Sequence, residues 1–508
     1  MEIEREVKFS MTPQAARQVS RRVQRAGPWR SRIVTNAYYD TATERLRRAG
    51  VALRLRRDGT RRLQTLKVDS DAAGLSTRAE WEIPAPGGKL DVAAFPREEI
   101  LAATGLDVTR LAARLRPRFE TRFARRSAPV VVDGATRAEV SIDRGYVAAG
   151  ERREPISEIE IELKSGDAGS LLRYAAKIAK PLGLALEFES KAERGYRLVA
   201  GETSPAPRKW RRPRLAELAT PSEAFAALFA AALTQAGANA RGVAQGHDPE
   251  YLHQMRVGLR RLRCTLVAFR ALVPKKVAQT LVERLRALMP NLGAARDWDV
   301  FTEGLVRLGM QAPERAPLIA PLLARARAKR GTARRRARLA AASPRLQGFL
   351  LRALRWVSAG PWKDAAANTG GSLGAFAGAA LERLHRRALR EAKELDWNDA
   401  ERRHRARIRI KRLRYACEFF AGSFAAAAAR PYIKRLEALQ DILGELNDIA
   451  VARRLLAELA PRGATRALTA AAGHVRHALT ARERMLVSSI GTVWSAFEKR
   501  RPFWTPEV

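Results

Sequence analysis

The chain has 508 residues, and 46% of them are hydrophobic, which supplies enough apolar material for about two to four packed domains and excludes wholesale disorder. It carries 94 Lys and Arg against 53 Asp and Glu, a net charge of +41. This excess predicts a polyanionic partner: nucleic acid, a phosphate polymer, a polyphosphorylated small molecule or an anionic membrane surface. Two cysteines exclude a disulfide scaffold, and 6% aromatic residues leave little material for stacking bases.

The N-terminus alternates charged and apolar residues, which no secretory signal does. No stretch of the sequence approaches about 18 uncharged apolar residues, the length of a membrane-spanning helix. The sequence therefore predicts a soluble, cytoplasmic protein, for which association with polyphosphate granules is open.

Up to residue 200 the charged residues recur with period two, in residues 2–8, 53–56, 63–68, 78–83 and 158–164. As strands, these runs place charges on one face and mostly apolar side chains on the other. One interpretation is an ordinary antiparallel sheet with its charges in solvent. The other is a closed sheet with the charges inside, where carboxylate rows face Arg and Lys rows. Oxygen ligands of this kind favour Mg²⁺ or Mn²⁺ over zinc, and a basic wall favours a linear polyphosphate.

The N-terminal run Glu4-Arg5-Glu6-Val7-Lys8 is an ExExK motif. Further pieces follow it in order: Tyr39-Asp40, Leu53 to Arg56, Lys67, Arg78-x-Glu80-x-Glu82, Asp143-Arg144-Gly145, Glu158 to Lys164 and Ser190 to Tyr196. Together they resemble the CYTH domain of the triphosphate tunnel metalloenzymes over about residues 1–200. The resemblance implies an α+β domain in which an eight-stranded antiparallel tunnel with flanking helices hydrolyses triphosphates with the help of Mg²⁺ or Mn²⁺.

The same resemblance implies roles for individual residues. The metal ligands are Glu4, Glu6, Glu160 and Glu162, with Asp143 and Glu158 as helpers, and Glu4, Glu6 and Lys8 form the catalytic set. The residues that bind the triphosphate are Lys8, Arg54, Arg56, Lys67, Arg78, Arg118, Arg122 and Lys191. For Arg118 and Arg122, in an arginine-rich stretch, a solvated basic face is the alternative. Residues 1–200 contain no histidine, which argues against zinc hydrolysis and against a phosphohistidine intermediate.

Residues 201–219 include three prolines and predict a linker, after which the periodicity becomes helical. The segment from His253 to Arg263 recurs 151 residues later as His404 to Arg414. Residues 284–300 recur in part at the same offset. The sequence thus predicts an internal duplication, with repeats at about 220–365 and 366–500.

Each repeat places one histidine and three basic residues on a single helix face, at positions i, i+3, i+7 and i+10. These stripes are His253, Arg256, Arg260 and Arg263, and His404, Arg407, Lys411 and Arg414. A solvated basic face is one interpretation. However, both copies keep the stripe and neither interleaves Glu, and the guanidinium fork suits phosphate oxygens. One histidine per stripe does not indicate a metal site.

The two repeats resemble the CHAD domain, an all-α module of two similar four-helix bundles, over about residues 220–500. The resemblance implies that inorganic polyphosphate is bound by His253, Arg256, Arg260, Arg261, Arg263, His404, Arg407, Lys411, Arg412 and Arg414.

The predicted protein therefore hydrolyses inorganic triphosphate in its N-terminal domain and binds long-chain polyphosphate in its C-terminal domain. Nucleoside triphosphates and thiamine triphosphate are alternative substrates, and non-specific binding of nucleic acid is open. The competing hypothesis is a non-catalytic polyphosphate-granule or nucleic-acid-associated protein with a vestigial tunnel. Intact Glu4, Glu6 and Lys8 count against it.

Overall fold

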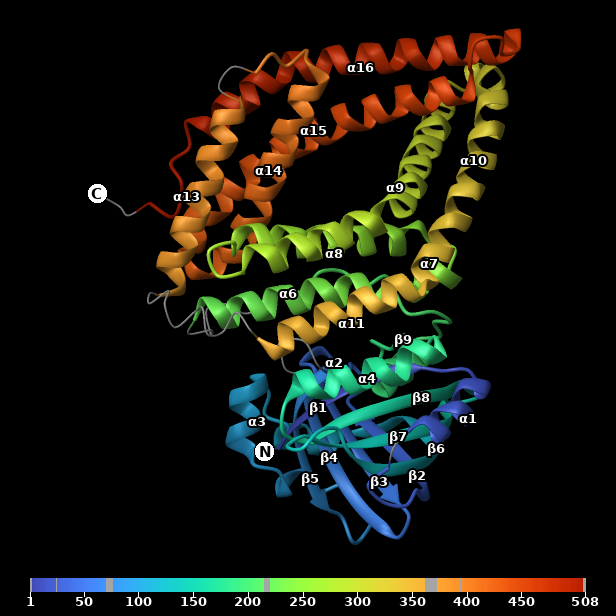
Figure 1. Cartoon of the computed structure of the whole chain (residues 1–508), viewed down its shortest axis with the longest axis vertical. Helices are drawn as coiled ribbons and strands as arrows, with labels where there is room; N and C mark the ends of the chain where they lie inside the picture. Colours follow the sequence, from blue (N-terminus) through green and yellow to red (C-terminus); the bar gives the residue numbers. More distant parts are fainter. Residues whose placement is uncertain are drawn as a thin grey trace. The chain divides into compact units, whose positions relative to one another are not determined.

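A computed structural model of the chain describes residues 2–23, 25–69, 76–213, 220–360, 372–392 and 395–505 (Figure 1). Two units can be distinguished. The first comprises residues 1–209, 229–242 and 342–361, and the second comprises residues 210–228, 243–341 and 362–508. Part of the expected linker, at 214–219, and the expected repeat boundary near 365 lie outside the described residues.

The first unit is built on one sheet with strand order β5-β4-β3-β2-β6-β7-β8-β1-β9, in which β1 also pairs with β5 and so closes the sheet. All the pairings are antiparallel. The eight long strands confirm the predicted tunnel, and β9 adds a two-residue pairing. The strands are β1 (Glu2–Ser10), β2 (Arg30–Asp40), β3 (Val51–Asp58), β4 (Arg61–Asp69), β5 (Ser76–Pro84), β6 (Arg116–Val131), β7 (Arg137–Ala149), β8 (Arg152–Ser165) and β9 (Ala185–Leu186).

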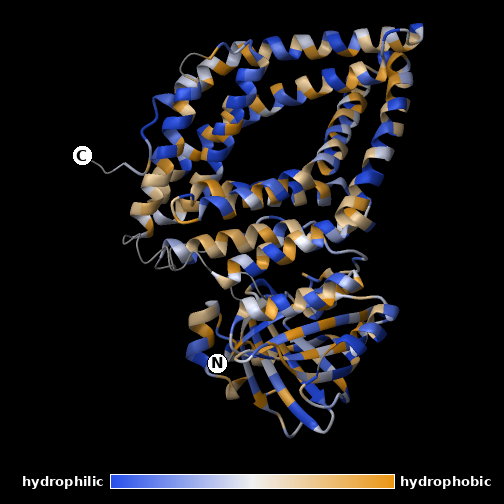
Figure 2. Ribbon diagram, in the orientation of Figure 1, coloured by the Kyte–Doolittle hydropathy of each residue, from blue (hydrophilic) through white to orange (hydrophobic). Residues whose placement is uncertain are grey.

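Apolar rows on the outer face of the sheet are buried by helices. Val7 and Phe9 of β1 pack in one core with α1 (Pro13–Arg22), α4 (Ala168–Leu182) and α11 (Pro344–Ala359). A second outer core joins β3, β4 and β5 to α3 (Arg97–Thr104). The alternation of hydrophilic and hydrophobic residues along the strands is visible in Figure 2. Because the helices cover the outer face, the charged rows face inward.

Helix α5 (Lys191–Val199) packs against β6 and β7 on the inner side of the sheet. It begins with a capping box, in which Ser190 and Glu193 exchange side-chain to backbone hydrogen bonds. Gly195 permits the close approach of α5 to β6, because a Cβ at this position would lie 2.0 Å from the Phe119 ring. The Tyr196 hydroxyl donates to Asp40 at 2.9 Å. These contacts fix Lys191 at the first position of the helix.

The second unit consists of helices, and its element order repeats. Helices α8 and α9 begin at residues 249 and 275, and α14 and α15 begin 151 residues later, at 400 and 426. Within the unit, α8 packs on α14 and α9 packs on α15. Among the described residues no helix is long and apolar enough to cross a membrane. The remaining helices of this unit are α8 (Pro249–Ala268), α9 (Lys275–Gln311), α10 (Ala316–Ala342), α13 (Leu373–Ala392), α14 (Ala400–Phe420), α15 (Ala426–Leu459) and α16 (Arg466–Glu498). The first unit contains a short α2 (Arg45–Arg48), and residues 229–242 of α6 (Pro221–Ala238) and α7 (Ala240–Gln245) also belong to it.

Candidate active site and polyanion surface

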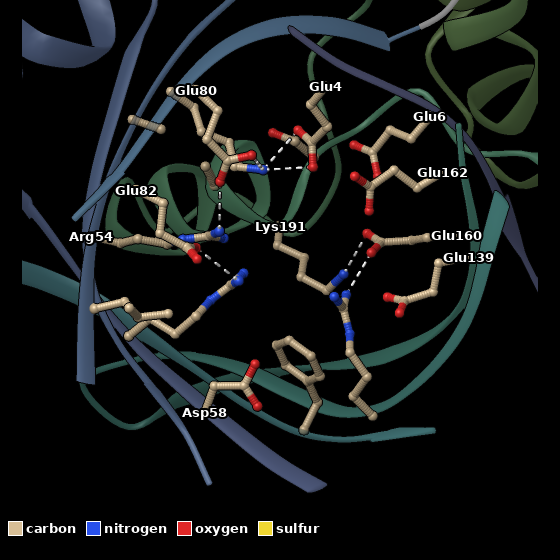
Figure 3. A pocket seen from close by; sticks show the side chains of 18 of the residues that line it. Glu4, Glu6, Arg54, Asp58, Glu80, Glu82, Glu139, Glu160, Glu162 and Lys191 are labelled. Atoms are coloured by element: carbon tan, nitrogen blue, oxygen red, sulfur yellow. Dashed lines mark hydrogen bonds and ion pairs between the residues drawn. The ribbon is translucent and has the colours of Figure 1, made fainter. Parts of the chain in front are cut away.

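The closed sheet surrounds a cavity of about 290 Å³, and most of the side chains that line it are charged (Figure 3). Glu6, Glu160 and Glu162 lie side by side on one wall, and Arg54 lies on the opposite wall. The acidic lining residues are Glu4, Glu6, Asp58, Glu80, Glu82, Glu139, Glu160 and Glu162, and the basic ones are Lys8, Arg32, Arg54, Arg56, Arg61, Lys67, Arg125, Lys164 and Lys191. The cavity therefore combines both kinds of charge.

Behind this wall, Asp143, Glu158 and Glu160 form a buried acidic cluster, with carboxylate oxygens within 4.8 Å of one another. Lys191 Nζ lies 2.8 Å from Asp143 and 2.9 Å from Glu160, and it also contacts Glu158. Arg125 forms ion pairs with Asp143 at 2.6 Å and Glu160 at 2.5 Å. Arg194 also lies 3.1 Å from Glu158 and Lys8 lies 3.1 Å from Glu160, so cations of the protein already compensate the charge of the three carboxylates.

The pKa values divide the buried carboxylates into two groups, those whose pKa is lowered and those whose pKa is raised. Burial raises the pKa of Asp143 and Glu160, but the neighbouring cations, Arg125 and Lys191 among them, outweigh it and leave both values lowered. Burial also raises the pKa of Glu6 to about 7, and Glu4 and Glu160 add to the increase although Lys8 opposes it. The pKa of Glu162 is raised as well, mainly by burial. Glu6 and Glu162 are therefore harder to ionise than ordinary carboxylates, although Lys8 lies 3.0 Å from Glu6 and Lys164 lies 2.5 Å from Glu162, and a hard divalent cation would favour their charged forms.

The opposite wall carries cations from β3 and β4, each near a carboxylate. Arg54 lies 3.7 Å from Glu80, and Lys67 lies 2.7 Å from Glu4 and 3.2 Å from Glu80. Burial and the charges of Arg54 and Arg125 lower the pKa of Arg56 to about 10. The positive charges of Arg54, Arg56 and Arg125 thus lie close together, an arrangement that a bound polyanion would stabilise.

In the second unit, basic side chains of α8 and α14 converge in the same way. Burial and the neighbouring charge of Arg260 lower the pKa of Arg256 to about 10. Burial, Arg260 and Arg407 lower the pKa of Lys411 to about 6. Arg256 Nη1 and Arg407 Nε are buried, and neither has a hydrogen-bond partner among the described residues. The histidines lie beside these residues: burial and Arg296 lower the pKa of His253, and His404 Nδ1 lies 3.1 Å from Asn447.

Two family models match this chain. The model of the CYTH domain matches residues 2–196, and the model of the CHAD domain matches residues 227–457. The chain carries a CYTH domain followed by a CHAD domain. Both resemblances expected from the sequence are thereby confirmed.

Two individual proteins illustrate the similarity. An inorganic triphosphatase of Haemophilus influenzae is 31% identical over 169 residues, which is 32% of this chain and 45% of that protein. The chain therefore spans less than half the length of this relative. The crystal structure of the CHAD domain from the plant Ricinus communis is 34% identical, with a TM-score of 0.51, and the match covers 59% of this chain and 98% of that one.

Most of the predicted residues of the CYTH domain come together in one place. The cavity is lined by Glu4, Glu6, Lys8, Arg54, Arg56, Lys67, Glu160, Glu162 and Lys191. Asp143 and Glu158 belong to the buried cluster behind them. Arg78 lies opposite Glu4 in the pairing of β1 with β5, and its side chain is outside the described residues.

The structure does not bring Arg118 and Arg122 into the CYTH cavity. Thr121, Phe123 and Arg125 of β6 share the inner face, as the hydrogen bond between Thr121 and the inward-facing Asn36 indicates. Arg122 is an odd number of positions from Arg125, so it lies on the outer face. Arg118 lies at an irregularity in the pairing of β2 with β6 and is not among the residues that line the cavity. From this strand the cavity is lined by Arg125, which sequence reasoning missed.

The predicted residues of the CHAD domain divide among three environments. His253, Arg256, Arg260, His404, Arg407 and Lys411 lie along the convergent faces of α8 and α14. Arg261 stacks on Trp210 at 4.6 Å, and Arg414 forms an ion pair with Glu418 at 2.6 Å. Arg263 and Arg412 instead lie near each other, where the positive charges of Arg263, Arg409 and Arg387 lower the pKa of Arg412.

Proposed function

We propose that the CYTH domain hydrolyses inorganic triphosphate and that the CHAD domain binds inorganic polyphosphate. The observation that carries the first half is the pair of walls in one small cavity, with carboxylates on one side, of which Glu6 and Glu162 have raised pKa values, and convergent cations on the other. The relative from Haemophilus influenzae, described as an inorganic triphosphatase, supports this choice of activity.

Glu4, Glu6 and Glu162 are the residues that would hold Mg²⁺ or Mn²⁺, because they line the cavity on two neighbouring strands and the pKa values of Glu6 and Glu162 are raised. A divalent ion bound there would stabilise negative charge on phosphate oxygens during transfer to water. Arg54, Arg56 and Lys67 would bind the phosphate chain from the opposite wall. Lys8 Nζ lies 3.0 Å from Glu6 and 3.1 Å from Glu160, so its ammonium group would face the reacting phosphate beside the acidic wall.

A substrate without an organic group fits the lining best. The aromatic residues of the cavity are Tyr38 and Phe123. Tyr38 stacks on Phe119 with ring centroids 4.6 Å apart, and its hydroxyl accepts a hydrogen bond from Arg54 at 3.4 Å. The ring and the hydroxyl of Tyr38 are therefore both in contact with other side chains, which leaves little open aromatic surface for a base or a thiazolium ring.

The test is phosphate release from inorganic triphosphate, long-chain polyphosphate, ATP and thiamine triphosphate, each with Mg²⁺, Mn²⁺ or a chelator. The proposal requires the highest kcat/KM for inorganic triphosphate and no turnover with the chelator. No metal-dependent release from any of the four would favour the non-catalytic alternative, and faster release from ATP or thiamine triphosphate would change the substrate.

The CHAD proposal rests on the convergent cations Arg256, Arg260, Arg407 and Lys411. Replacing all four with Ala in the full chain should weaken polyphosphate binding far more than replacing Arg284, Arg286, Arg335 and Arg336, which are exposed on α9 and α10. Below the pKa of Lys411, which is about 6, the two variants lose the same charge, so equal losses of affinity measured there would mean diffuse attraction. Competition with duplex DNA at equal phosphate concentration separates polyphosphate from nucleic acid.

A further inference from the structure

Helix α14 carries a second row of arginines on the side opposite Arg407 and Lys411. Arg402, Arg405, Arg409 and Arg412 follow the same i, i+3, i+7, i+10 spacing as the predicted stripe. At 100° per residue the two rows are about 160° apart around the helix axis. A ligand held by one row therefore cannot be reached by the other.

This second row opens onto a cavity of about 710 Å³ between α13 and α14. Arg387 and Arg390 line it from α13, and Arg402, Arg405 and Arg409 line it from α14, together with Glu391 and Leu395. Five cations thus converge in the cavity on one lining carboxylate. We call this cavity the α13–α14 pocket.

Ion pairs do not neutralise the α13–α14 pocket. Glu391 lies 2.9 Å from Arg405 and 3.6 Å from Arg409, and Asp399, outside the lining, lies 3.4 Å from Arg402, so two carboxylates face five arginines. No carboxylate among the described residues forms an ion pair with Arg387 or Arg390. Burial and the charges of Arg270, Arg409 and Arg390 lower the pKa of Arg387.

The positive charge continues from the pocket toward α8. Arg412 interacts with Arg263 of α8 as well as with Arg409 and Arg387. Arg383 donates to the carbonyl oxygens of Val267 and Ala268 at 3.2 and 2.9 Å. The arginines therefore continue from α13 and α14 to the end of α8.

The lining selects the chemistry of the ligand. Guanidinium forks bind phosphate oxygens in pairs, and Leu395 is the apolar lining residue, with no aromatic ring beside it. A nucleic acid or nucleotide would find no stacking surface here. We propose that the α13–α14 pocket is a second binding site for condensed inorganic phosphate, separate from the convergent faces of α8 and α14. The proposal extends the polyphosphate binding proposed above, but it requires only the arginines of the pocket.

The first test is chemical modification of arginines in the full chain with phenylglyoxal, followed by peptide mass spectrometry, in a chelator that prevents hydrolysis. Short polyphosphate chains should protect Arg387 and Arg390 in the wild type. They should protect them equally in the variant in which Arg256, Arg260, Arg407 and Lys411 are Ala. Protection of Arg260 and Arg407 alone would overturn the second site. Protection of Arg387 and Arg390 without protection of Arg260 and Arg407 would support the second site and would refute binding on the convergent faces of α8 and α14.

The second test compares two double variants of equal charge. In one, Arg387 and Arg390 are replaced by Gln, and in the control, Arg335 and Arg336 are replaced by Gln. Loss of two phosphate contacts should lower the slope of log affinity on log salt by roughly 1.4, since each contact to a flexible strand contributes about 0.7. The control should leave the slope unchanged. Equal slopes in both variants, or equal protection of Arg387 by duplex DNA or ATP, would overturn the assignment.

Discussion

Glu6 lies where the carboxylates of two neighbouring strands meet, opposite Glu162 in the pairing of β1 with β8. Glu4→Gln together with Glu6→Gln should abolish phosphate release from inorganic triphosphate, because two of the three proposed metal-holding carboxylates are lost. In a chelator its melting temperature should equal or exceed that of the wild type, since repulsion is removed. Glu139→Gln, also in the cavity lining, is the control and should retain activity. Release at the wild-type rate in the double variant would refute the metal site.

Arg125 compensates two buried carboxylates at once. Replacing Arg125 with Met should lower the free energy of unfolding by about 3–5 kcal/mol at neutral pH, because Asp143 keeps its charge in a buried site with one fewer partner. The pKa of Asp143 is lowered in the folded protein, so its ionised form stabilises the fold above its unfolded pKa. That contribution disappears as the pH falls through the folded pKa. The difference in the free energy of unfolding between the wild type and Arg125→Met should therefore become smaller in acid.

Arg122→Met is the matched control for this measurement. Arg122 is exposed on the outer face of the same strand, so its loss should change stability by no more than about 0.5 kcal/mol. Urea unfolding of the two variants tests which face of β6 lines the cavity. A larger effect at Arg122 than at Arg125 would restore the original expectation.

At the scale of the strand, period-two alternation predicted the cavity face of β1, β3, β4 and β8 but not of β6. On most strands the apolar row faces outer helices, so the charged row must face in. On β6 the apolar residues Phe119 and Phe123 face inward, because α5 packs on the inner side. An interior helix that arrives about 70 residues later in the chain leaves no local signal in β6. The helical duplication, in contrast, repeats in the sequence itself and was predictable from it.

The contact of α5 with β6 gives a prediction for the helix as a unit. Gly195→Ala should displace α5 and draw Lys191 away from Glu158 and Glu160, since the new Cβ would lie 2.0 Å from the Phe119 ring. We expect a loss of about 1–3 kcal/mol of stability, as for other overpacked sites, and lower activity. Gly444→Ala in α15 is the control: its Cβ would meet nothing within 4 Å, so it should be neutral or stabilising. Equal melting temperatures for both variants would mean that β6 yields to the added methyl group.

At the scale of the whole molecule, the first unit includes a helix that the sequence order assigns to the C-terminal half. Leu351 of α11 is buried in the same core as Leu171 and Leu172 of α4. A fragment of residues 1–209 should therefore expose this apolar surface, bind a hydrophobic dye and aggregate at concentrations where the full chain does not. Leu351→Ala in the full chain should act in the same direction, at about 2–5 kcal/mol. A monomeric fragment with the melting temperature of the full chain would instead support the domain boundary at residues 201–219.

Lys411 has a consequence for the proton balance of the CHAD domain. With a pKa of about 6, its amine is mostly neutral at pH 7, while Arg260 and Arg407 remain charged beside it. A bound phosphate chain would raise that pKa toward 10.5, so polyphosphate binding should take up as much as one proton, and affinity should fall as the pH rises from about 7 to 9.

Calorimetry in buffers of different ionisation enthalpy measures this uptake directly. The observed heat should vary with the buffer in the wild type and vary less in Lys411→Arg, whose side chain stays charged, the remainder coming from His253, whose pKa is also lowered. Buffer-independent heats in the wild type would contradict the prediction. Where the prediction holds, each phosphate chain that docks withdraws a proton from solution, so the occupancy of the CHAD domain follows pH even though the ligand itself hardly titrates there.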